Sequence, residues 1–304
     1  MTDTLSAEEL VSGLLRLLAV RDLAGDRFEG PRKPGGVGRI FGGQVIAQAL
    51  AAATLTVTED RPVHSLHAYF LRGGNEDHLI DLRVERDLDG GSFSNRRVVA
   101  SQSGKPILTL SASFHRREPG ASHAAAMPQV PPPEDLRCEA EIRREMAERV
   151  PERHRGFMLR QRAIEMRSVE PTHWMISAKA GDPAPQPVSH TWLRSVAPLP
   201  DDPRIHRAVL AYASDYNLLG TSALAHGLSW ISGNVMGASL DHAMWFHDDF
   251  RADEWLLYAC DSPWAGGARG FNRGGFYTRD GRLVAETAQE GLIRRISPPP
   301  RDKA

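Results

Sequence analysis

Three polar side chains in the second half of this 304-residue chain are of types that together can activate a water molecule. Asp215 follows a predicted helix, Ser239 lies in the segment 238–247, and Gln289 lies in a predicted strand. A carboxylate can accept a proton from water, while a hydroxyl and a carboxamide can hold that water by hydrogen bonds. We expect these three residues to form one site.

Each of the three also has an ordinary structural interpretation. An aspartate just after a helix is commonly a capping or turn group, a serine in a strand is commonly a tolerated small residue, and a glutamine can satisfy sheet backbone. Asp241 is a rival base, because it lies two residues from Ser239 and strand alternation would point both side chains to one face.

Two other kinds of site are disfavoured by spacing. His64, His67, His242 and His247 lack a His-x-x-x-His pair or a cysteine partner that would complete a metal set, so we expect no metal. A serine hydrolase would need Gly-x-Ser-x-Gly, and the segment 237–241 lacks the final glycine. Ser239 is therefore better interpreted as a water ligand than as a nucleophile.

Bulk composition excludes several classes of protein. The chain is 41% hydrophobic and 25% charged, with a formal net charge of −1, which gives no electrostatic argument for a nucleic-acid partner. Its two cysteines, Cys138 and Cys260, cannot form a disulfide framework or a metal knuckle. No leader pattern and no apolar run of about 20 residues is present. We expect a cytoplasmic protein without a stable membrane anchor.

The first half of the chain predicts a covering helix, a buried helix and a meander of antiparallel strands. Ser6 and Glu9 form a capping box ahead of an apolar stripe that ends at Leu18. A glycine-rich segment, 35–44, precedes a helix over 45–53 that is apolar almost all round, which is typical of a helix enclosed by other structure. Alternating segments then predict strands at 63–71, 80–86, 94–102 and 106–115.

The second half repeats this order after a proline-rich crossing. Residues 134–149 predict an exposed charged helix, and strands are expected at 157–169 and 189–196. Asp202 and Pro203 begin a helix over 204–214, and further strands are expected at 255–260, 270–278 and 283–293. The prediction is a domain at 1–117, a linker at 118–152 and a second domain at 153–304.

An internal duplication explains this repeated order. His67-Ala68 aligns with His242-Ala243, Asn95-Arg96 aligns with Asn272-Arg273, and Gln289 falls on Ala112. Since a His-Ala-aromatic core then occurs in both halves, His242 is interpreted as structural. The polar set occurs only in the second half, which predicts one active site for the duplicated pair.

Several segments resemble the motifs of the type II acyl-CoA thioesterases, in that family's order. They are Phe41-Gly42-Gly43-Gln44, the segments 64–73 and 92–98, Tyr212-Ala213-Ser214-Asp215, the segment 240–247, Ala268-Arg269-Gly270-Phe271 and Gln289-Glu290-Gly291. The resemblance covers residues 10–293 apart from the linker. It implies an α+β double hotdog fold, in which two tandem hotdog domains each wrap an antiparallel sheet around a central helix.

The resemblance also implies hydrolysis of acyl-CoA to a free fatty acid and CoA. The family's Asp, Ser or Thr, and Gln triad falls on Asp215, Ser239 and Gln289. No cofactor is expected. A homo-oligomer, either a dimer or a tetramer, is expected. The alternatives are a non-catalytic acyl-CoA-binding or scaffold protein and a hotdog enoyl-CoA hydratase or dehydratase that depends on a histidine such as His242.

Binding residues outside the triad are also expected. Backbone N–H groups at a helix start are natural oxyanion donors, and Gly42 and Gly43 would let a substrate approach closely. Arg96, Arg97 and Arg269 are candidates for the CoA phosphates, although arginines at strand ends are as commonly solubilising.

Overall fold

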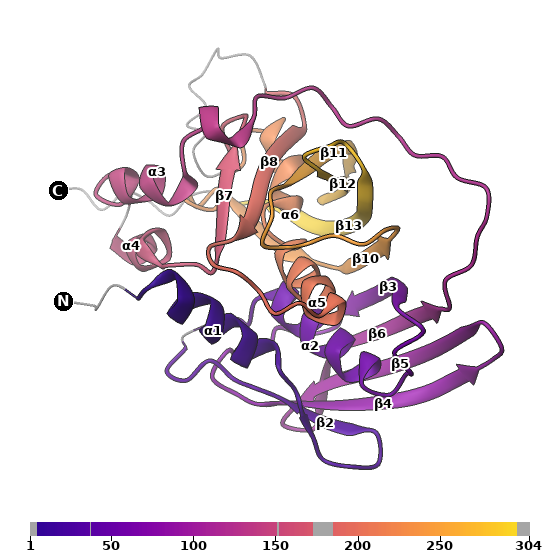
Figure 1. The fold of residues 1–304 in the computed structure, drawn as a ribbon. Helices are drawn as coiled ribbons and strands as arrows, with labels where there is room; N and C mark the ends of the chain where they lie inside the picture. The colour runs from indigo at the N-terminus through magenta and orange to yellow at the C-terminus, as the bar shows by residue number, and fades with distance from the viewer. Residues whose placement is uncertain (1–4, 37, 151, 173–184, 297–304) are drawn as a thin grey trace.

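One antiparallel sheet organises the whole chain (Figure 1). The computed structural model describes residues 5–36, 38–150, 152–172 and 185–296, so the predicted domain ends at 1–4 and 297–304 lie outside it. Within these residues thirteen strands join in the order β1-β2-β4-β5-β6-β3-β10-β13-β12-β11-β8-β7, with β9 pairing to β13. The sheet and its helices have the α+β double hotdog architecture.

The N-terminal half supplies the sheet from its edge to its centre. Its elements are α1 (Ala7–Leu18), β1 (Arg21–Asp22), β2 (Arg27–Gly30), α2 (Gly42–Thr54), β3 (Val63–Phe70), β4 (Ile80–Asp89), β5 (Phe93–Gln102) and β6 (Lys105–His115). The four predicted strands are confirmed. The capping box of α1 is present, since the N–H of Glu9 bonds the Ser6 hydroxyl and the Ser6 N–H bonds the Glu9 carboxylate.

The C-terminal half begins with short helices that join the two parts. Its elements are η1 (Pro133–Asp135), α3 (Glu139–Met146), α4 (Glu152–Leu159), β7 (Ile164–Ser168), β8 (Val188–Ser195), α5 (Pro203–Ala213), α6 (Leu218–Leu224), β9 (Val235–Ser239), β10 (Asp241–Phe246), β11 (Leu256–Gly266), β12 (Arg269–Thr278) and β13 (Leu283–Arg295).

Two predictions in the connecting region were wrong. The predicted strand at 157–169 is helical in its first part, because α4 runs to Leu159 and β7 begins only at Ile164. The helix predicted as exposed buries one side, where Glu139 and Arg143 are each 2% exposed and Glu139 pairs with Arg162. The charged sequence of α3 therefore gave no indication that one side of the helix is packed against the protein.

The two halves meet where β3 pairs with β10 at the centre of the sheet (Figure 1). Helix α2 is buried along nearly its whole length and lies on β3 to β6. Helix α5 packs against α2, while α6 lies within the curl of β11, β12 and β13. The buried apolar residues of α2 and α5 belong to one core cluster that spans both halves.

Strand registers correct part of the predicted duplication. Leu66 and His242 are both 0% exposed on the helix-covered face, whereas His67 is exposed on the other face. His67 lies opposite Ser111 and Ala243 lies opposite Ala288, so with Gln289 matched to Ala112 the residue that corresponds to His242 is Leu66, one residue away from the predicted match. The argument that a shared histidine is structural in both halves fails with that alignment.

A second register refines the match around Gln289. Arg96 lies opposite Ala112 on β5 and β6, and Asn272 lies opposite Gln289 on β12 and β13. All four side chains are buried. The match of Gln289 with Ala112 agrees with this pairing, but Arg96 corresponds to Asn272, not to the residue after it.

Candidate active site

Asp215 is placed by a hydrogen-bonded turn at the end of α5. The preceding residue, Ser214, accepts a hydrogen bond from Nε2 of His242 on its hydroxyl at 2.9 Å and one from the Tyr258 hydroxyl on its carbonyl at 2.8 Å. The Ser214 hydroxyl itself donates to Ala211 O. Two strands of the sheet thus fix the residue next to the carboxylate.

The Asp215 carboxylate lies between the two halves of the molecule. Its Oδ2 accepts the backbone N–H of Gly43, at the start of α2, at 2.9 Å. Its Oδ1 accepts from Nε2 of Gln289, on β13, at 3.1 Å. Burial raises the pKa of Asp215 to about 6, and the two hydrogen bonds partly oppose that rise.

The glycines at the start of α2 make this contact possible. A Cβ atom on Gly42 would lie 2.7 Å from Oδ2 of Asp215, and one on Gly43 would lie 2.2 Å from the carbonyl oxygen of Tyr212. The close approach expected at these glycines is therefore made by Asp215 and the end of α5. The Gly43 N–H is engaged by Asp215 and is therefore not free to stabilise an oxyanion.

Gln289 is held on the inner face of β13. It is 0% exposed, and its backbone carbonyl accepts from Nδ2 of Asn272 at 3.4 Å. Asn272 also accepts the N–H of Ser222 in α6 at 2.8 Å, which ties this strand pair to the helix. Among the described residues the Oε1 atom of Gln289 has no hydrogen-bond partner, so it can accept one from a small molecule.

Ser239 faces the same side of the sheet as Gln289. It lies opposite Gly291, and Gly291 is two residues from Gln289 along β13. Ser239 and Gly42 both line a cavity of about 330 Å³, together with Phe70. Within the described chain no hydrogen bond joins its hydroxyl directly to Asp215 or Gln289. Of the cavity lining, Gly42 is the residue that packs against the Asp215 carboxylate.

Asp241 does not share a face with Ser239, contrary to expectation. The pairing with β13 shifts by one residue between Ser239–Gly291 and Ala243–Ala288, which breaks the strand alternation. The carboxylate of Asp241 instead accepts the backbone N–H of Glu290 at 2.7 Å. This bond stabilises the irregular strand junction and accounts for the residue without a catalytic role.

His242 is neutral in the folded protein. Burial lowers its pKa to about 4, and Nε2 is occupied by Ser214. Over the parts of the chain that the structure covers, no cluster of three or more His, Cys, Asp or Glu side chains could hold a metal ion.

The three arginines proposed for the CoA phosphates are occupied by protein groups. Arg96 is 1% exposed, and its five N–H groups bond Thr56, Asp89 and backbone carbonyls. Arg97 pairs with Glu85 and Asp87. Arg269 pairs with Glu290 and lies over the ring of Trp264. Arg96 stabilises the end of α2 and has no N–H group left for a CoA phosphate.

Two arginines at the cavity were missed in the sequence. Arg39 and Arg72 line the same 330 Å³ cavity as Ser239, and both are exposed. Neither forms an ion pair with a carboxylate within the described ranges, although Arg72 donates to the carbonyl of Pro106. The available signal was their position, since Arg39 lies within the glycine-rich segment 35–44 and Arg72 within the segment 64–73.

Among the helices that the structure describes, none is long and apolar enough to cross a membrane.

Comparisons with known proteins agree with this architecture. Residues 160–292 match the family model described as acyl-CoA thioesterase, and residues 30–115 match the one described as acyl-CoA thioesterase N-terminal domain. Acyl-coenzyme A thioesterase 8 of Homo sapiens is 42% identical over 266 residues, covering 84% of this chain and 81% of that protein.

Two bacterial proteins match over nearly the full length. Acyl-CoA thioesterase 2 of Haemophilus influenzae is 34% identical over 286 residues, covering 94% of this chain and 98% of that protein. The crystal structure of acyl-CoA thioesterase II TesB2 from Mycobacterium marinum has 39% identity and a TM-score of 0.75, covering 93% and 98% of the two chains. The chain belongs to the type II acyl-CoA thioesterases, a family of thioester hydrolases.

Proposed function

We propose that this protein hydrolyses fatty acyl-CoA by direct attack of a water molecule that Asp215, Ser239 and Gln289 hold. The observation that carries this proposal is the position of Asp215. Its carboxylate is fixed on both oxygens, by Gly43 and Gln289, and it packs against Gly42, which lines a cavity together with Ser239. A fixed base beside a cavity is what a hydrolysis without a covalent intermediate requires.

The reaction needs one proton transfer in each direction. Asp215 removes a proton from the water as its oxygen attacks the thioester carbonyl carbon. The tetrahedral intermediate then collapses, the carbon–sulfur bond breaks, and the proton passes to the leaving thiolate of CoA. The products are the carboxylic acid and CoA, and the aspartate is again ionised.

The raised pKa suits Asp215 to this role. A carboxylate with an ordinary pKa near 4 is a weak base, whereas one with a pKa of about 6 remains largely ionised at neutral pH and accepts a proton more readily. Its hydrogen bonds from Gly43 and Gln289 keep it in one orientation.

Gln289 and Ser239 supply the remaining contacts to the water. Nε2 of Gln289 is used by Asp215, so its Oε1 is the atom that accepts the second proton of the water in a hydrogen bond. The Ser239 hydroxyl donates from the opposite strand. The serine therefore orients water and forms no acyl-enzyme.

The cavity provides for both ends of the substrate. Val45, Phe70 and Leu108 give it apolar walls for the acyl group next to the thioester. Arg39 and Arg72 at its rim meet the phosphates of CoA. These two replace Arg96 in the proposed site, while Arg97 and Arg269 remain weaker candidates because each is paired with a carboxylate.

The test is a thiol-release assay on purified protein and its Asp215→Asn variant, without added metal. We expect turnover of acyl-CoA by the wild type and a loss of at least about 10²–10⁴-fold in the variant, the usual contribution of a general base. Binding of a non-hydrolysable acyl-CoA thioether should persist. Full activity in the variant would remove Asp215 from the mechanism.

The same assay separates the two alternatives. Tight thioether binding with no hydrolysis at any chain length would indicate an acyl-CoA-binding or scaffold protein. Loss of enoyl-CoA absorbance with no thiol release would indicate a hydratase.

A further inference from the structure

A second cavity lies at the far end of the helix pair that carries the proposed active site. Helices α2 and α5 run antiparallel, so the start of α2 meets Asp215 at the end of α5. The opposite ends, with Thr54 of α2, its C-cap Leu55, and Pro203 and Arg204 of α5, line a cavity of about 810 Å³.

Strand registers show that this cavity is the counterpart of the active site in the duplicated fold. Val63 lies opposite Phe114 on β3 and β6, as Ser239 lies opposite Gly291 on β9 and β13. Phe114 and Gly291 are each two residues beyond the matched pair Ala112 and Gln289, so they match each other. Val63 therefore corresponds to Ser239, and Val63 lines the second cavity.

The catalytic groups are missing at these positions. Valine replaces the serine at position 63, and Ala112 stands where the second half has Gln289. At the helix start, Pro203 has no N–H, and the Arg204 N–H is capped by the Asp202 carboxylate at 2.9 Å. The second cavity thus keeps the shape of a site at this junction and has lost the groups that activate water.

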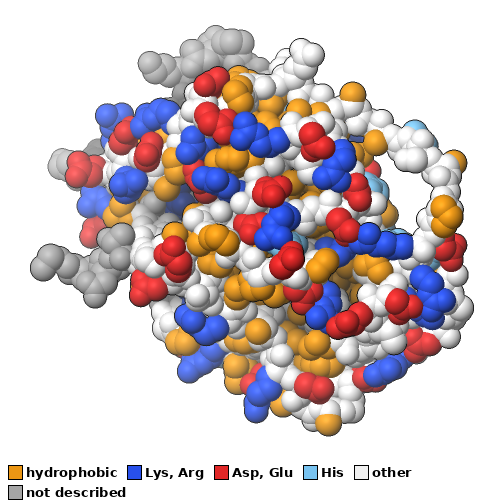
Figure 2. All heavy atoms as spheres, in the orientation of Figure 1, with side chains coloured by type: hydrophobic (Ala, Val, Ile, Leu, Met, Phe, Trp, Pro, Cys, Tyr) orange, Lys and Arg blue, Asp and Glu red, His pale blue; other side chains and the backbone are white. Residues whose placement is uncertain are grey.

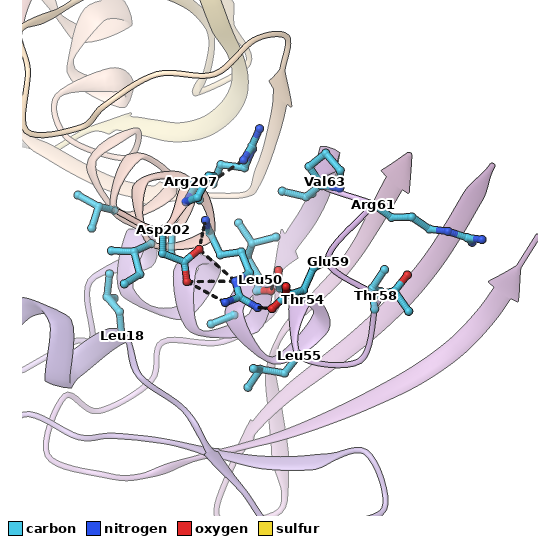
Figure 3. A pocket seen from close by; sticks show the side chains of 18 of the residues that line it. Leu18, Leu50, Thr54, Leu55, Thr58, Glu59, Arg61, Val63, Asp202 and Arg207 are labelled. Carbon is cyan, nitrogen blue, oxygen red and sulfur yellow. Dashed lines mark hydrogen bonds and ion pairs between the residues drawn. The ribbon is translucent and has the colours of Figure 1, made fainter. Parts of the chain in front are cut away.

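The walls of the second cavity are mainly apolar and reach the molecular surface. Figure 3 shows Leu18 from α1 and Leu50 from α2 beneath the end of α5 that carries Asp202 and Arg207. In Figure 2 hydrophobic side chains come to the surface over α1, α2 and α5, with charged side chains around them. The volume lies within the range of about 300–1,000 Å³ that small-molecule sites occupy.

The rim of the second cavity has more arginines than carboxylates, although Arg116, Arg117 and Arg204 are paired with Asp60, Asp249 and Asp202. Its lining includes five arginines (Arg61, Arg116, Arg117, Arg204 and Arg207) and three carboxylates (Glu59, Asp60 and Asp202). Arg207 is 7% exposed and bonds Asp249 through Nη2 at 2.9 Å. Its Nε is buried and has no hydrogen-bond partner among the described residues, so it can donate to a ligand carboxylate or phosphate.

We propose that the second cavity is a non-hydrolytic binding site for a long acyl chain with an anionic head. The apolar walls take the chain, and Nε of Arg207 takes the head. Free fatty acid and acyl-CoA share this chemistry. Both are molecules that a thioesterase meets, as product and as substrate, and both can enter from the open side of the cavity.

The experiment measures how many ligands bind per chain. Radiolabelled palmitate and the thioether S-hexadecyl-CoA are titrated by equilibrium dialysis against the wild type and the Ala208→Trp variant, which fills the second cavity from α5. Ala140→Trp, at an exposed position of α3, is the matched control. Circular dichroism melting identifies variants that fold.

We expect Ala208→Trp to bind one equivalent fewer than the wild type and the control, for whichever ligand is native to the cavity. Its hydrolysis rate should stay within about twofold of the wild type. Equal stoichiometry in all three proteins would overturn the proposal. So would a change in sedimentation of Ala208→Trp with unchanged binding, which would show that a second copy of the chain covers the cavity.

A second variant tests the head group and covers the case in which tryptophan prevents folding. Arg207→Gln should weaken the cavity-dependent binding of palmitate about tenfold and leave that of hexadecanol unchanged. An equal loss for both ligands would contradict a role in anion binding. Since binding is measured without turnover, failure of hydrolysis in the assay above would leave this result interpretable.

Discussion

The two ends of the α2–α5 pair have the same framework and opposite chemistry. At one end Gly42 and Gly43 let the Asp215 carboxylate reach a helix start, and Gln289 holds it from the sheet. At the other end Pro203 and the capped Arg204 start α5. Val63 and Ala112 occupy the matching strand positions.

This contrast shows what the chemistry requires beyond the fold. The framework positions a helix start, a helix end and two strands at both ends, but only at one end does a carboxylate from the end of one helix bond the start of the other. An unpaired buried carboxylate is costly, so it persists where hydrogen bonds and function retain it. The other end is free to keep an apolar cavity.

Gln289→Ala places alanine at the active-site position, as at the counterpart position Ala112. Among the variants that keep Asp215, it should have the largest effect. It removes the bond to Oδ1 of Asp215 and the acceptor for water. We expect kcat to fall about 10²–10³-fold in the thiol-release assay, as for loss of one positioned polar group. Ala112→Leu, at the counterpart position, should leave kcat within about threefold; a comparable loss there would show that the two ends are not independent.

Gly43→Ala tests the close packing at the active end. The added methyl would meet the carbonyl of Tyr212, which forces the start of α2 away from Asp215. We expect kcat to fall about 10–100-fold and the free energy of unfolding to fall by about 1–3 kcal/mol in urea titrations. Ala51→Gly, near the other end, should change kcat little. Normal activity in Gly43→Ala would mean that the Gly43–Asp215 bond is dispensable.

Arg39→Ala should affect binding more than chemistry. Arg39 lines the active cavity and has no carboxylate partner among the described residues. We expect KM for acyl-CoA to rise about tenfold with kcat nearly unchanged, since each charge-assisted bond contributes about 1.5–3 kcal/mol. Arg97→Ala is the comparison, and an equal rise in KM for both would move the CoA site toward β5.

Tyr258→Phe should have the smallest effect. It removes the hydrogen bond to Ser214 O and leaves the ring, so the turn before Asp215 loosens. We expect a loss of about 1 kcal/mol in unfolding free energy and a few-fold loss in kcat. If kcat fell as far as in Gln289→Ala, Tyr258 would have to act on the substrate itself.

The sequence predicted the architecture well because the elements have strong local signals. Alternation placed the strands of the meander, and Ser6 and Glu9 marked the start of α1. The strand predicted at 157–169 failed because the side chains around the helix α4 carry no clear helical period. The burial of Glu139 could not be foreseen, since its partner Arg162 lies 23 residues away.

The residue types of the candidate site could be predicted from the sequence, but their spatial arrangement could not. The polarity difference between Gln289 and Ala112 was visible in sequence. The off-by-one match of His242 arose because local similarity cannot distinguish the two faces of a strand, and the error at Asp241 arose because one irregular residue reverses alternation. Arg39 and Arg72 were missed because a cavity between the halves has no local sequence pattern.

The central claim is that Asp215 is a buried base with a raised pKa. Because its folded pKa of about 6 exceeds the unfolded value, the ionised form is disfavoured in the fold. Stability should therefore fall as pH rises from about 4 to about 6, and above that the cost stays at roughly 2–3 kcal/mol. Asp215→Asn should then be more stable than the wild type at pH 8, and the difference should close near pH 4.

The most direct measurement is the pH profile of kcat/KM for the wild type, with the stability of wild type and Asp215→Asn measured over the same range. We predict that kcat/KM rises with pH through about 6, that the variant lacks this activity, and that the variant is the more stable protein at pH 8. A profile without an acid limb near pH 6, together with a variant no more stable than the wild type at pH 8, would contradict the assignment of Asp215 as the base.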